Sequence, residues 1–418
     1  MRSKLSWCLA WTIASCAQPK LETPARLRIA VIGPLEKLSA GNLGGYSRLA
    51  QDWVYEPLAR VMNDGSLEPA LAESLHRTGS ELRLHLRPGA RFSDGSPVTM
   101  ADVVRSLTRV NLKFKVDGGS VIVPSASEQL LPFAPIWKDS AGAEIGTGAF
   151  RVVRELPGKI VLHRLVSVPK RIDTVELDAY DTPREALART LKGDADLLPR
   201  VEPRMAEFFD NVQRLRLVHG DSIQAASIGF SLRLTAKERR GLAASLPTAE
   251  LARTAFGESC KPWNGPRSTP APLPTQKLDV LVPLLDVGYE RLGLAVRRSL
   301  GALGGKLQIK GPGDVIKAIV SRNFDLYISP ILVWPPAAVG VVFHSGTVNN
   351  VVGYSDAAVD RALDAGDWNQ ALKALAENPP ALFVCRQERL IAIDSRVKNP
   401  RIGASSSLEF LPEWEFTE

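Results

Sequence analysis

Apolar and polar positions change their spacing several times along the chain, and the clearest signals lie between residues 53 and 104. Within 81–86, leucines alternate with charged or polar side chains, which predicts a half-buried strand. The apolar residues of 54–61 recur at helical spacing, as do those of 71–75, so two short helical segments are predicted there. The Ser-Asp-Gly-Ser-Pro sequence at 93–97 predicts a turn, because glycine accepts a positive φ and proline fixes its own.

Later helices carry start and stop signals. Thr99 is followed by Asp102, and Thr235 by Glu238, at the spacing of a capping box, in which each side chain bonds the other residue's backbone N–H. A further helix is predicted over 183–193, with proline at its first position and glycine at its end.

Strands and helices alternate in the C-terminal half. Apolar runs at 278–283 and 307–310 flank a helical pattern at 288–303, and a second helix over 314–321 leads into a strand at 324–327. This alternation predicts an α/β architecture. At 418 residues the chain exceeds one ordinary core, so two or three domains are expected.

Composition and charge narrow the class of protein. With 45% hydrophobic and 23% charged residues, the chain is globular and not disordered. Its formal charge of +7 is spread along the whole length, and paired arginines such as Arg239-Arg240 sit on predicted helices, where solvated faces are usual. This pattern is not that of a nucleic-acid-binding surface, and no nucleic-acid partner is expected.

The N-terminus has the pattern of an export signal. Arg2 and Lys4 precede an apolar segment at 5–13, which is too short to span a bilayer. Small residues then lead to Cys16, so residues 1–15 are predicted to be a lipoprotein signal peptide and Cys16 the lipidation site. The alternative is a cytoplasmic chain with an apolar start and an incidental cysteine. Loss of the leader would leave 50 basic and 45 acidic residues.

Two further cysteines, Cys260 and Cys385, remain once Cys8 of the leader and Cys16 are set aside. An even pair in an oxidising compartment permits a disulfide between them. Two buried free thiols are the default expectation.

Motifs of enzyme chemistry are absent from the sequence. The histidines are scattered, without catalytic or metal-ligand spacing: His76, His85, His163, His219 and His344. No G-x-S-x-G motif is present, and the glycine-rich segment 301–306 is followed by leucine where a P-loop requires Ser or Thr. The chain is therefore not expected to be an enzyme, and neither a metal nor a cofactor is predicted.

Three sequence motifs in the N-terminal part occur in a characteristic order. They are Y-E-P-L at 55–58, P-A-L-A-E-S at 69–74 and L-R-P-G-A-R-F-S-D-G-S-P-V-T-M-A-D-V at 86–103. This order resembles the opening signature of the family 5 extracytoplasmic solute-binding proteins, the oligopeptide, dipeptide and nickel receptors of ABC importers. The resemblance covers about residues 22–415, with further matches at 147–153, 192–197 and 354–363.

The resemblance implies an α/β fold of two lobes, of the periplasmic-binding-protein type (type II, cluster C), with an extra small domain. Domain I is expected to be discontinuous, domain II is the small extra one, and domain III is the second ligand-binding lobe. The expected boundaries are 22–55, 147–236 and 398–418 for domain I, 56–146 for domain II and 237–397 for domain III.

In function, the resemblance implies a substrate-binding lipoprotein of an ABC-type importer. Such a receptor captures a peptide-like or other small solute between its lobes and delivers it to permease and ATPase subunits in the membrane. The expected location is the periplasm or cell envelope, with a lipid anchor in the membrane, and the expected state is a monomer. The shortened chain also permits a second hypothesis, a divergent binding-protein fold with a sensory or interaction role and no transport.

The family pattern also suggests where the ligand binds. By resemblance, the ligand lies beside the segment after the first strand, here Gly44-Gly45-Tyr46, and beside a strand that ends in a tryptophan, here Trp334. Glycines allow the backbone to approach a ligand, and the two aromatic side chains offer apolar faces with a polar group each. The alternatives are a flexible turn for the glycines and ordinary core packing for Trp334.

Three more residues are ligand-binding candidates. Ser231 stands where the family usually has an asparagine, and it could donate or accept a hydrogen bond. Arg233 could pair with an anionic group, although a surface ion pair is the more common role of an arginine. Trp263 lies in a loop rich in proline and glycine that resembles the family's loop over the pocket, with packing as the alternative.

One departure from the family pattern bears on the ligand. Peptide-binding members place an aspartate three residues beyond this tryptophan, where it pairs with the peptide's ammonium group. Here that position is Ala337, and no acid follows Trp334 before Asp356. A buried ammonium without a carboxylate partner is costly. The sequence therefore disfavours peptides with a free N-terminus and leaves open a blocked or cyclic peptide, a sugar, an anionic solute or a chelated metal.

Overall fold

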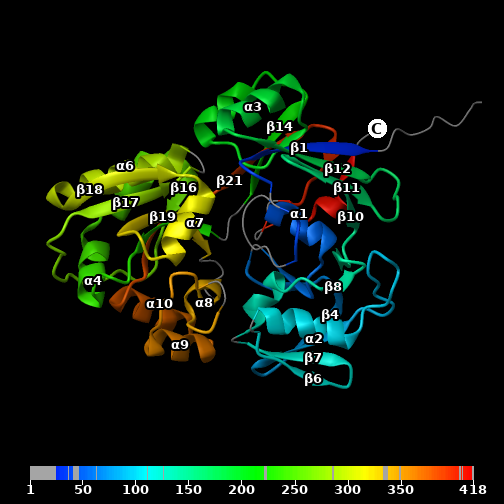
Figure 1. Ribbon diagram of the computed structural model, residues 1–418, viewed down its shortest axis with the longest axis horizontal. Coiled ribbons are helices and arrows are strands. Elements are labelled where there is room, and N and C mark those ends of the chain that lie inside the picture. Colours follow the sequence, from blue (N-terminus) through cyan, green and yellow to red (C-terminus); the bar gives the residue numbers. More distant parts are fainter. Residues whose placement is uncertain are drawn as a thin grey trace, which may run out of the picture.

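The computed structural model describes residues 25–416, apart from residues 36, 41–46, 63, 111, 126, 221–223, 285–286, 333–337, 348–349, 404–405 and 407. Its elements form a first lobe, a small domain and a second lobe, which lie at the upper right, the lower right and the left of Figure 1. None of the helices in the described ranges is long and apolar enough to cross a bilayer.

The first lobe is built on a seven-stranded mixed sheet in the order β10-β11-β12-β1-β13-β21-β14. Its strands are β1 (Arg26–Ile32), β10 (Phe150–Leu156), β11 (Lys159–Arg164), β12 (Thr174–Tyr180), β13 (Leu197–Leu198), β14 (Leu215–Gly220) and β21 (Arg389–Asp394). The central strand β1 runs parallel to β12 and β13. Short elements complete this part of the chain: η2 (Pro203–Phe209), β22 (Val397–Lys398), η5 (Leu411–Glu413) and β23 (Glu415–Phe416).

Alternate residues of β1 pack on opposite faces of this sheet. Ile29 packs with helix α1 (Ser47–Val54) on one face, whereas Ala30 packs with α3 (Pro183–Lys192) on the other. The predicted signals of α3 are confirmed, since its cap residue accepts a hydrogen bond from the N–H of Glu185 and Gly193 ends it at φ 91°.

The small domain contains a four-stranded antiparallel sheet in the order β4-β5-β7-β6, with two hairpins and one α-helix. Its elements are β2 (Ala59–Val61), β3 (Leu67–Pro69), β4 (Ala72–Thr78), β5 (Glu81–Leu86), α2 (Met100–Arg109), β6 (Lys115–Asp117), β7 (Ser120–Pro124), η1 (Glu128–Phe133), β8 (Trp137–Ser140) and β9 (Ala143–Gly146). The predicted strand over 81–86 and the capping box of Thr99 with Asp102 are both confirmed.

The two short helical segments predicted before this strand are wrong. Helix α1 ends at Val54, and residues 59–61 form a strand. The helix does not continue because Pro57 disfavours the helical conformation of the residue before it. Residues 72–78 pair with β5 along their length. A few apolar positions fit either period in so short a stretch, and the sheet partner decides.

The second lobe is built on a six-stranded sheet in the order β16-β20-β15-β19-β17-β18. Its strands are β15 (Gln224–Phe230), β16 (Cys260–Pro262), β17 (Leu278–Pro283), β18 (Gly304–Lys310), β19 (Leu326–Leu332) and β20 (Ala381–Gln387). One face carries α4 (Ala236–Ser245), α5 (Thr248–Phe256) and α6 (Val287–Ser299), with the short η3 (Gly257–Ser259) and η4 (Gly301–Leu303) at helix ends. The other carries α7 (Pro312–Val320), α8 (Ala338–Phe343), α9 (Ala357–Asp364) and α10 (Trp368–Glu377).

Within this sheet the predicted parallel unit is present, because β17 runs parallel to both β18 and β19. The capping box of Thr235 with Glu238 at the start of α4 is also confirmed. Gly229 of β15 lies under the ring of Tyr327, and a Cβ atom at Gly229 would stand 1.8 Å from a ring carbon. Glycine is therefore required at this position.

The chain passes between the two sheets twice. It leaves the first lobe after β14, forms β15 to β20 in the second lobe, and returns to the first lobe with β21. The strand 224–230, assigned by sequence to domain I, thus pairs in the second-lobe sheet, and 389–394, assigned to domain III, pairs in the first-lobe sheet. Hydrophobic patterns do not state which sheet a strand joins, so the sequence placed these two boundaries beyond the crossovers.

Candidate ligand-binding cleft

Both crossovers lie at one edge of the second-lobe sheet. Gln224, the first residue of β15, pairs with Leu332, the last residue of β19, and Ala225 pairs with Arg386 near the end of β20. The parallel strands β17 and β19 therefore end at this edge, where the chain connects to the first lobe. In open α/β sheets ligands bind outside the carboxyl ends of the strands. The edge that faces the first lobe is thus the candidate site.

Polar contacts join the lobes beside the crossovers. The Arg200 guanidinium of the first lobe donates to Gln387 Oε1 at 3.1 Å, and the hydroxyl of Tyr289 on α6 donates to the same oxygen at 2.9 Å. Arg291 on α6 pairs with Glu202 of the first lobe at 2.8 Å. These contacts fix the start of α6 against the first lobe.

Arg389, the first residue after the return crossover, lies in the same region. Its Nη1 donates to the carbonyl of Gly403 at 3.2 Å. Burial, together with the positive charge of Arg200, lowers the pKa of Arg389 to about 10. The guanidinium remains protonated at neutral pH, and the carboxylate of Glu409 is close enough to act on it.

A second contact, at the far end, joins the small domain to helices α8 and α9 of the second lobe. Val341 of α8 is 2% exposed and belongs to the hydrophobic core of the small domain. Lys113 of the small domain pairs with Asp364 at 3.0 Å, and His344 Nε2 lies 3.4 Å from the same carboxylate. Burial alone would raise the pKa of Asp364, but Lys113 and His344 lower it overall.

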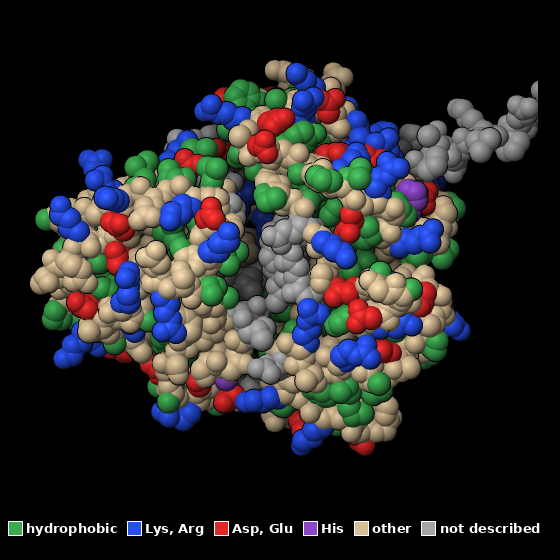
Figure 2. Space-filling view, viewed as in Figure 1, with side chains coloured by type: hydrophobic (Ala, Val, Ile, Leu, Met, Phe, Trp, Pro, Cys, Tyr) green, Lys and Arg blue, Asp and Glu red, His purple; other side chains and the backbone are tan. Residues whose placement is uncertain are grey.

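The two sets of contacts lie at opposite ends of the boundary between the second lobe and the rest of the molecule. Figure 2 shows a hollow in the upper part of this boundary. The residues predicted to line it, Gly44, Gly45, Tyr46 and Trp334, lie outside the described residues, as does Cys16. Their place in the cleft stays a prediction. No sequence motif marks Arg200, Tyr289, Gln387 or Arg389, because they come together only where the chain crosses between the lobes.

Ser231 and Arg233 lie at the opposite edge of the second-lobe sheet. Phe230, the last residue of β15, pairs with Leu326, the first residue of β19, so Ser231 follows the end of the strand remote from the crossovers. A strand of seven residues spans about 23 Å. Both residues therefore lie away from the edge at which the crossovers lie, and their role beside a ligand stays a prediction.

The contacts of both residues are with their own lobe. Ser231 is buried, and its N–H donates to the carbonyl of Asp325 at 2.8 Å. Arg233 donates to the carbonyl of Phe324 at 2.6 Å and pairs with the Asp325 carboxylate at 2.9 Å. These bonds fasten the start of β19 to the loop before α4.

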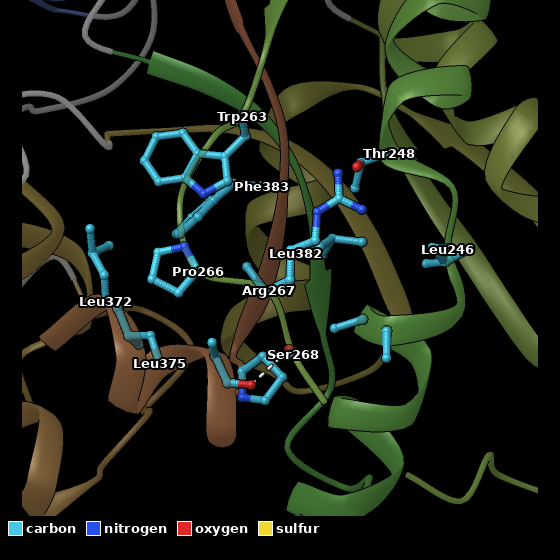
Figure 3. A pocket seen from close by; sticks show the side chains of 15 residues that line it. Leu246, Thr248, Trp263, Pro266, Arg267, Ser268, Leu372, Leu375, Leu382 and Phe383 are labelled. Carbon is cyan, nitrogen blue, oxygen red and sulfur yellow. Dashed lines mark hydrogen bonds between the residues drawn. The ribbon is translucent and has the colours of Figure 1, made fainter. Parts of the chain in front are cut away.

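Trp263 lines a separate hollow within the second lobe, shown in Figure 3. Its backbone N–H donates to the carbonyl of Val384 at 3.1 Å, and its ring meets Phe383 edge-on with 5.0 Å between ring centroids. Gly265 allows the loop to fold over the ring, since a Cβ there would lie 2.3 Å from the indole nitrogen. The tryptophan is thus packed and partly exposed at once.

Cys260 and Cys385 are joined by a disulfide that ties β16 to β20. The sequence permits either a disulfide or two buried free thiols, with the free thiols expected, and the structure has the disulfide. Pairing of β16 with β20 depends on residues 125 positions apart, which no local pattern reveals.

Asp356, the first acid after the predicted aromatic anchor, caps helix α9. Its Oδ1 accepts from the N–H of Ala358 at 2.8 Å, and its Oδ2 accepts from the side-chain amide of Asn378 at 2.7 Å. Burial would raise the pKa of Asp356, but these hydrogen bonds lower it overall. The carboxylate is therefore engaged in its own lobe. In the described ranges no group of three or more His, Cys, Asp or Glu side chains could hold a metal ion.

Residues 66–120 match the family model described as bacterial extracellular solute-binding proteins, family 5, middle part. The chain is similar over 95% of its length to the oligopeptide-binding protein AppA from Bacillus subtilis, solved with a nonapeptide, with a TM-score of 0.76, 15% identity and all of that chain covered. The fold is that of the family 5 solute-binding proteins.

Other solved structures have the same fold. The protein AgaA from A. tumefaciens R10, solved with agropinic acid, matches 94% of this chain and 99% of its own, with a TM-score of 0.77 and 16% identity. The ABC transporter substrate-binding protein CtaP from Listeria monocytogenes matches 94% of this chain and 100% of its own, with a TM-score of 0.71 and 17% identity. No curated protein matches the sequence.

Proposed function

We propose that this protein is the substrate-binding lipoprotein of an ABC-type importer. It captures one small solute between the first and second lobes and delivers it to a membrane permease with its ATPase. The observation that carries the proposal is the pair of crossovers at one edge of the second-lobe sheet, with contacts at both ends of the boundary between the second lobe and the rest of the molecule. Such a pair of lobes can close on a ligand about the crossovers.

The lipid anchor is the second part of the proposal. Cleavage before Cys16 would leave a thiol that accepts a diacylglycerol and holds the receptor at the membrane beside its permease. Radiolabelled palmitate should enter the wild-type protein and be absent from Cys16→Ala. Labelling that survives this substitution would refute the anchor.

The ligand class follows from the charges around the cleft. Two guanidinium groups, those of Arg200 and Arg389, lie beside the crossovers with the Glu409 carboxylate near Arg389, and the acid that pairs with a peptide ammonium is missing after Trp334. We therefore propose a peptide-like or other small solute that has no free ammonium at this position, with an anionic group favoured. Gly44, Gly45, Tyr46 and Trp334 are proposed to line the same cleft.

Transport and sensing make different predictions for cells that lack this protein. If the protein serves an importer, uptake of the solute that co-purifies with it should fall in a deletion strain and return with the wild-type gene. Uptake that does not change would favour the alternative, a sensory or interaction role with no transport.

A further inference from the structure

The hollow under Trp263 lies on the outer side of the second lobe, along a stretch of β20 that no strand covers. Strand β16 pairs with β20 only at residues 385–387, so the edge at 381–383 is left without a strand partner on that side. Helices α4 and α10 and the loop 263–268 surround this edge and leave a hollow that is open to solvent.

Apolar side chains make up most of the lining. Trp263 and Pro266 form one wall together with Phe383. In Figure 3, Leu372 of α10 lies to the left of Pro266, and Leu375 lies below it. An apolar body of several carbon atoms would bury its surface against these side chains, which is favourable in proportion to the area removed from water.

The polar side-chain groups that face the hollow include three hydrogen-bond donors. They are the Arg267 guanidinium, the indole N–H of Trp263 and the hydroxyl of Thr248; Figure 3 shows the guanidinium beside this hydroxyl. Within the part of the chain that the structure describes, none of the three has a hydrogen-bond or ion-pair partner. Ser268 is engaged, because its hydroxyl donates to the carbonyl of Ala376 at 2.7 Å.

Charge decides which ligand fits. None of the fifteen lining residues is an acid, and Arg267 is the lone cation among them. Arg267 is exposed, so its guanidinium is hydrated and free to turn toward a ligand. A cationic molecule in the hollow would meet its like charge, whereas a carboxylate would accept hydrogen bonds from Arg267 and Thr248.

From this complementarity we propose that the hollow is a second binding site, for a small amphipathic carboxylate with a hydrocarbon body. The carboxylate pairs with Arg267, and the hydrocarbon body packs on Trp263 and Phe383. The site is formed within one lobe and is independent of the cleft between the lobes. The Cys260–Cys385 disulfide, three residues before Trp263, and the Ser268 hydrogen bond hold its loop in place, so little ordering is needed on binding.

Sodium octanoate is the probe for the test, with octylamine as the cation of the same chain length. The indole N–H resonance of Trp263, assigned by its loss in Trp263→Phe, should shift on titration with octanoate, with a Kd of about 1 mM or tighter. Octylamine should leave it in place. Arg267→Gln should weaken octanoate binding by roughly tenfold or more, because a charge-assisted hydrogen bond is lost.

Arg298→Gln is the matched control, since Arg298 is an exposed arginine of α6 away from the hollow, and its loss changes the net charge equally. It should bind octanoate as the wild type does. Three results would overturn the proposal: no shift of the Trp263 resonance at about ten times this concentration, equal shifts with octylamine, or unchanged octanoate affinity in Arg267→Gln. Circular dichroism of each variant confirms that it is folded.

Discussion

Replacing Val341 by alanine should favour the open arrangement of the lobes. Val341 extends from α8 of the second lobe into the core of the small domain, where it is 2% exposed. The substitution removes two buried methyl groups, each contributing about 0.8 kcal/mol, and leaves a small cavity. If the lobes separate, this contact is lost in any case, so the closed state alone is destabilised, by roughly 1–2.4 kcal/mol. The ratio of closed to open molecules then falls by roughly 5- to 50-fold.

The measurement is a distance between spin labels on the two sides of this contact. The labels are attached to cysteines that replace Thr108 at the end of α2 and Ala358 on α9, in a protein without Cys8 and Cys16. Double electron–electron resonance then reports the distance between the small domain and the second lobe. In Val341→Ala a second population with a longer label-to-label distance should appear in the distribution. This population should be larger in Val341→Asp, because the closed state would bury a charge.

Val359→Ala is the matched control for this experiment. Val359 is as buried as Val341, but it lies in the core of the second lobe itself. Its truncation should lower the melting temperature and leave the distance distribution as in the wild type. If both Val341 variants also keep the wild-type distribution, the reasoning that α8 contributes to closure is wrong.

Three further predictions concern stability. Gly229→Ala places a methyl carbon against the aromatic ring of the facing strand, so it should lower the free energy of unfolding by about 1–3 kcal/mol and lower the melting temperature. In the control Gly257→Ala no atom lies within 4 Å of the new carbon, so only backbone strain should destabilise the protein. Burial would raise the pKa of Asp394, but hydrogen bonds from Arg396 lower it overall. The ionised carboxylate therefore stabilises the fold at pH values above its unfolded pKa of about 3.9, and this stabilisation is lost as the pH falls through the lowered folded pKa. Asp394→Asn should make the free energy of unfolding less dependent on pH in this acid range. Reduction of the single described disulfide should lower the free energy of unfolding by about 2–5 kcal/mol, measured by urea denaturation with and without reductant.

Local signals in the sequence predicted local structure well. The capping boxes at Thr99 and Thr235 and the helix that ends at Gly193 are set by contacts within a few residues, and the structure has all three. The segments 54–61 and 71–75 were predicted helical, yet residues 59–61 and 72–78 are strands, because sheet partners distant in sequence decide a short apolar stretch.

The site was harder to predict, because its residues meet through topology. Ser231 is a ligand candidate because it stands where the family usually has an asparagine, and β15, which runs away from the first lobe, places it at the edge remote from the crossovers. Arg200 and Gln387 lie far apart in sequence and meet only because the chain returns to the first lobe at 388. No period or motif in the sequence contains that information.

The central claim is that one solute binds between the lobes, and native mass spectrometry tests it most directly. Protein incubated with an extract of small metabolites and then desalted should carry one added mass per chain. Trp334→Ala should lose that mass at an unchanged melting temperature, because a buried aromatic anchor contributes roughly 2 kcal/mol or more to binding, whereas Arg267→Gln should keep it. The bare mass of the chain in the wild-type protein, or an added mass that Trp334→Ala retains, would contradict the account.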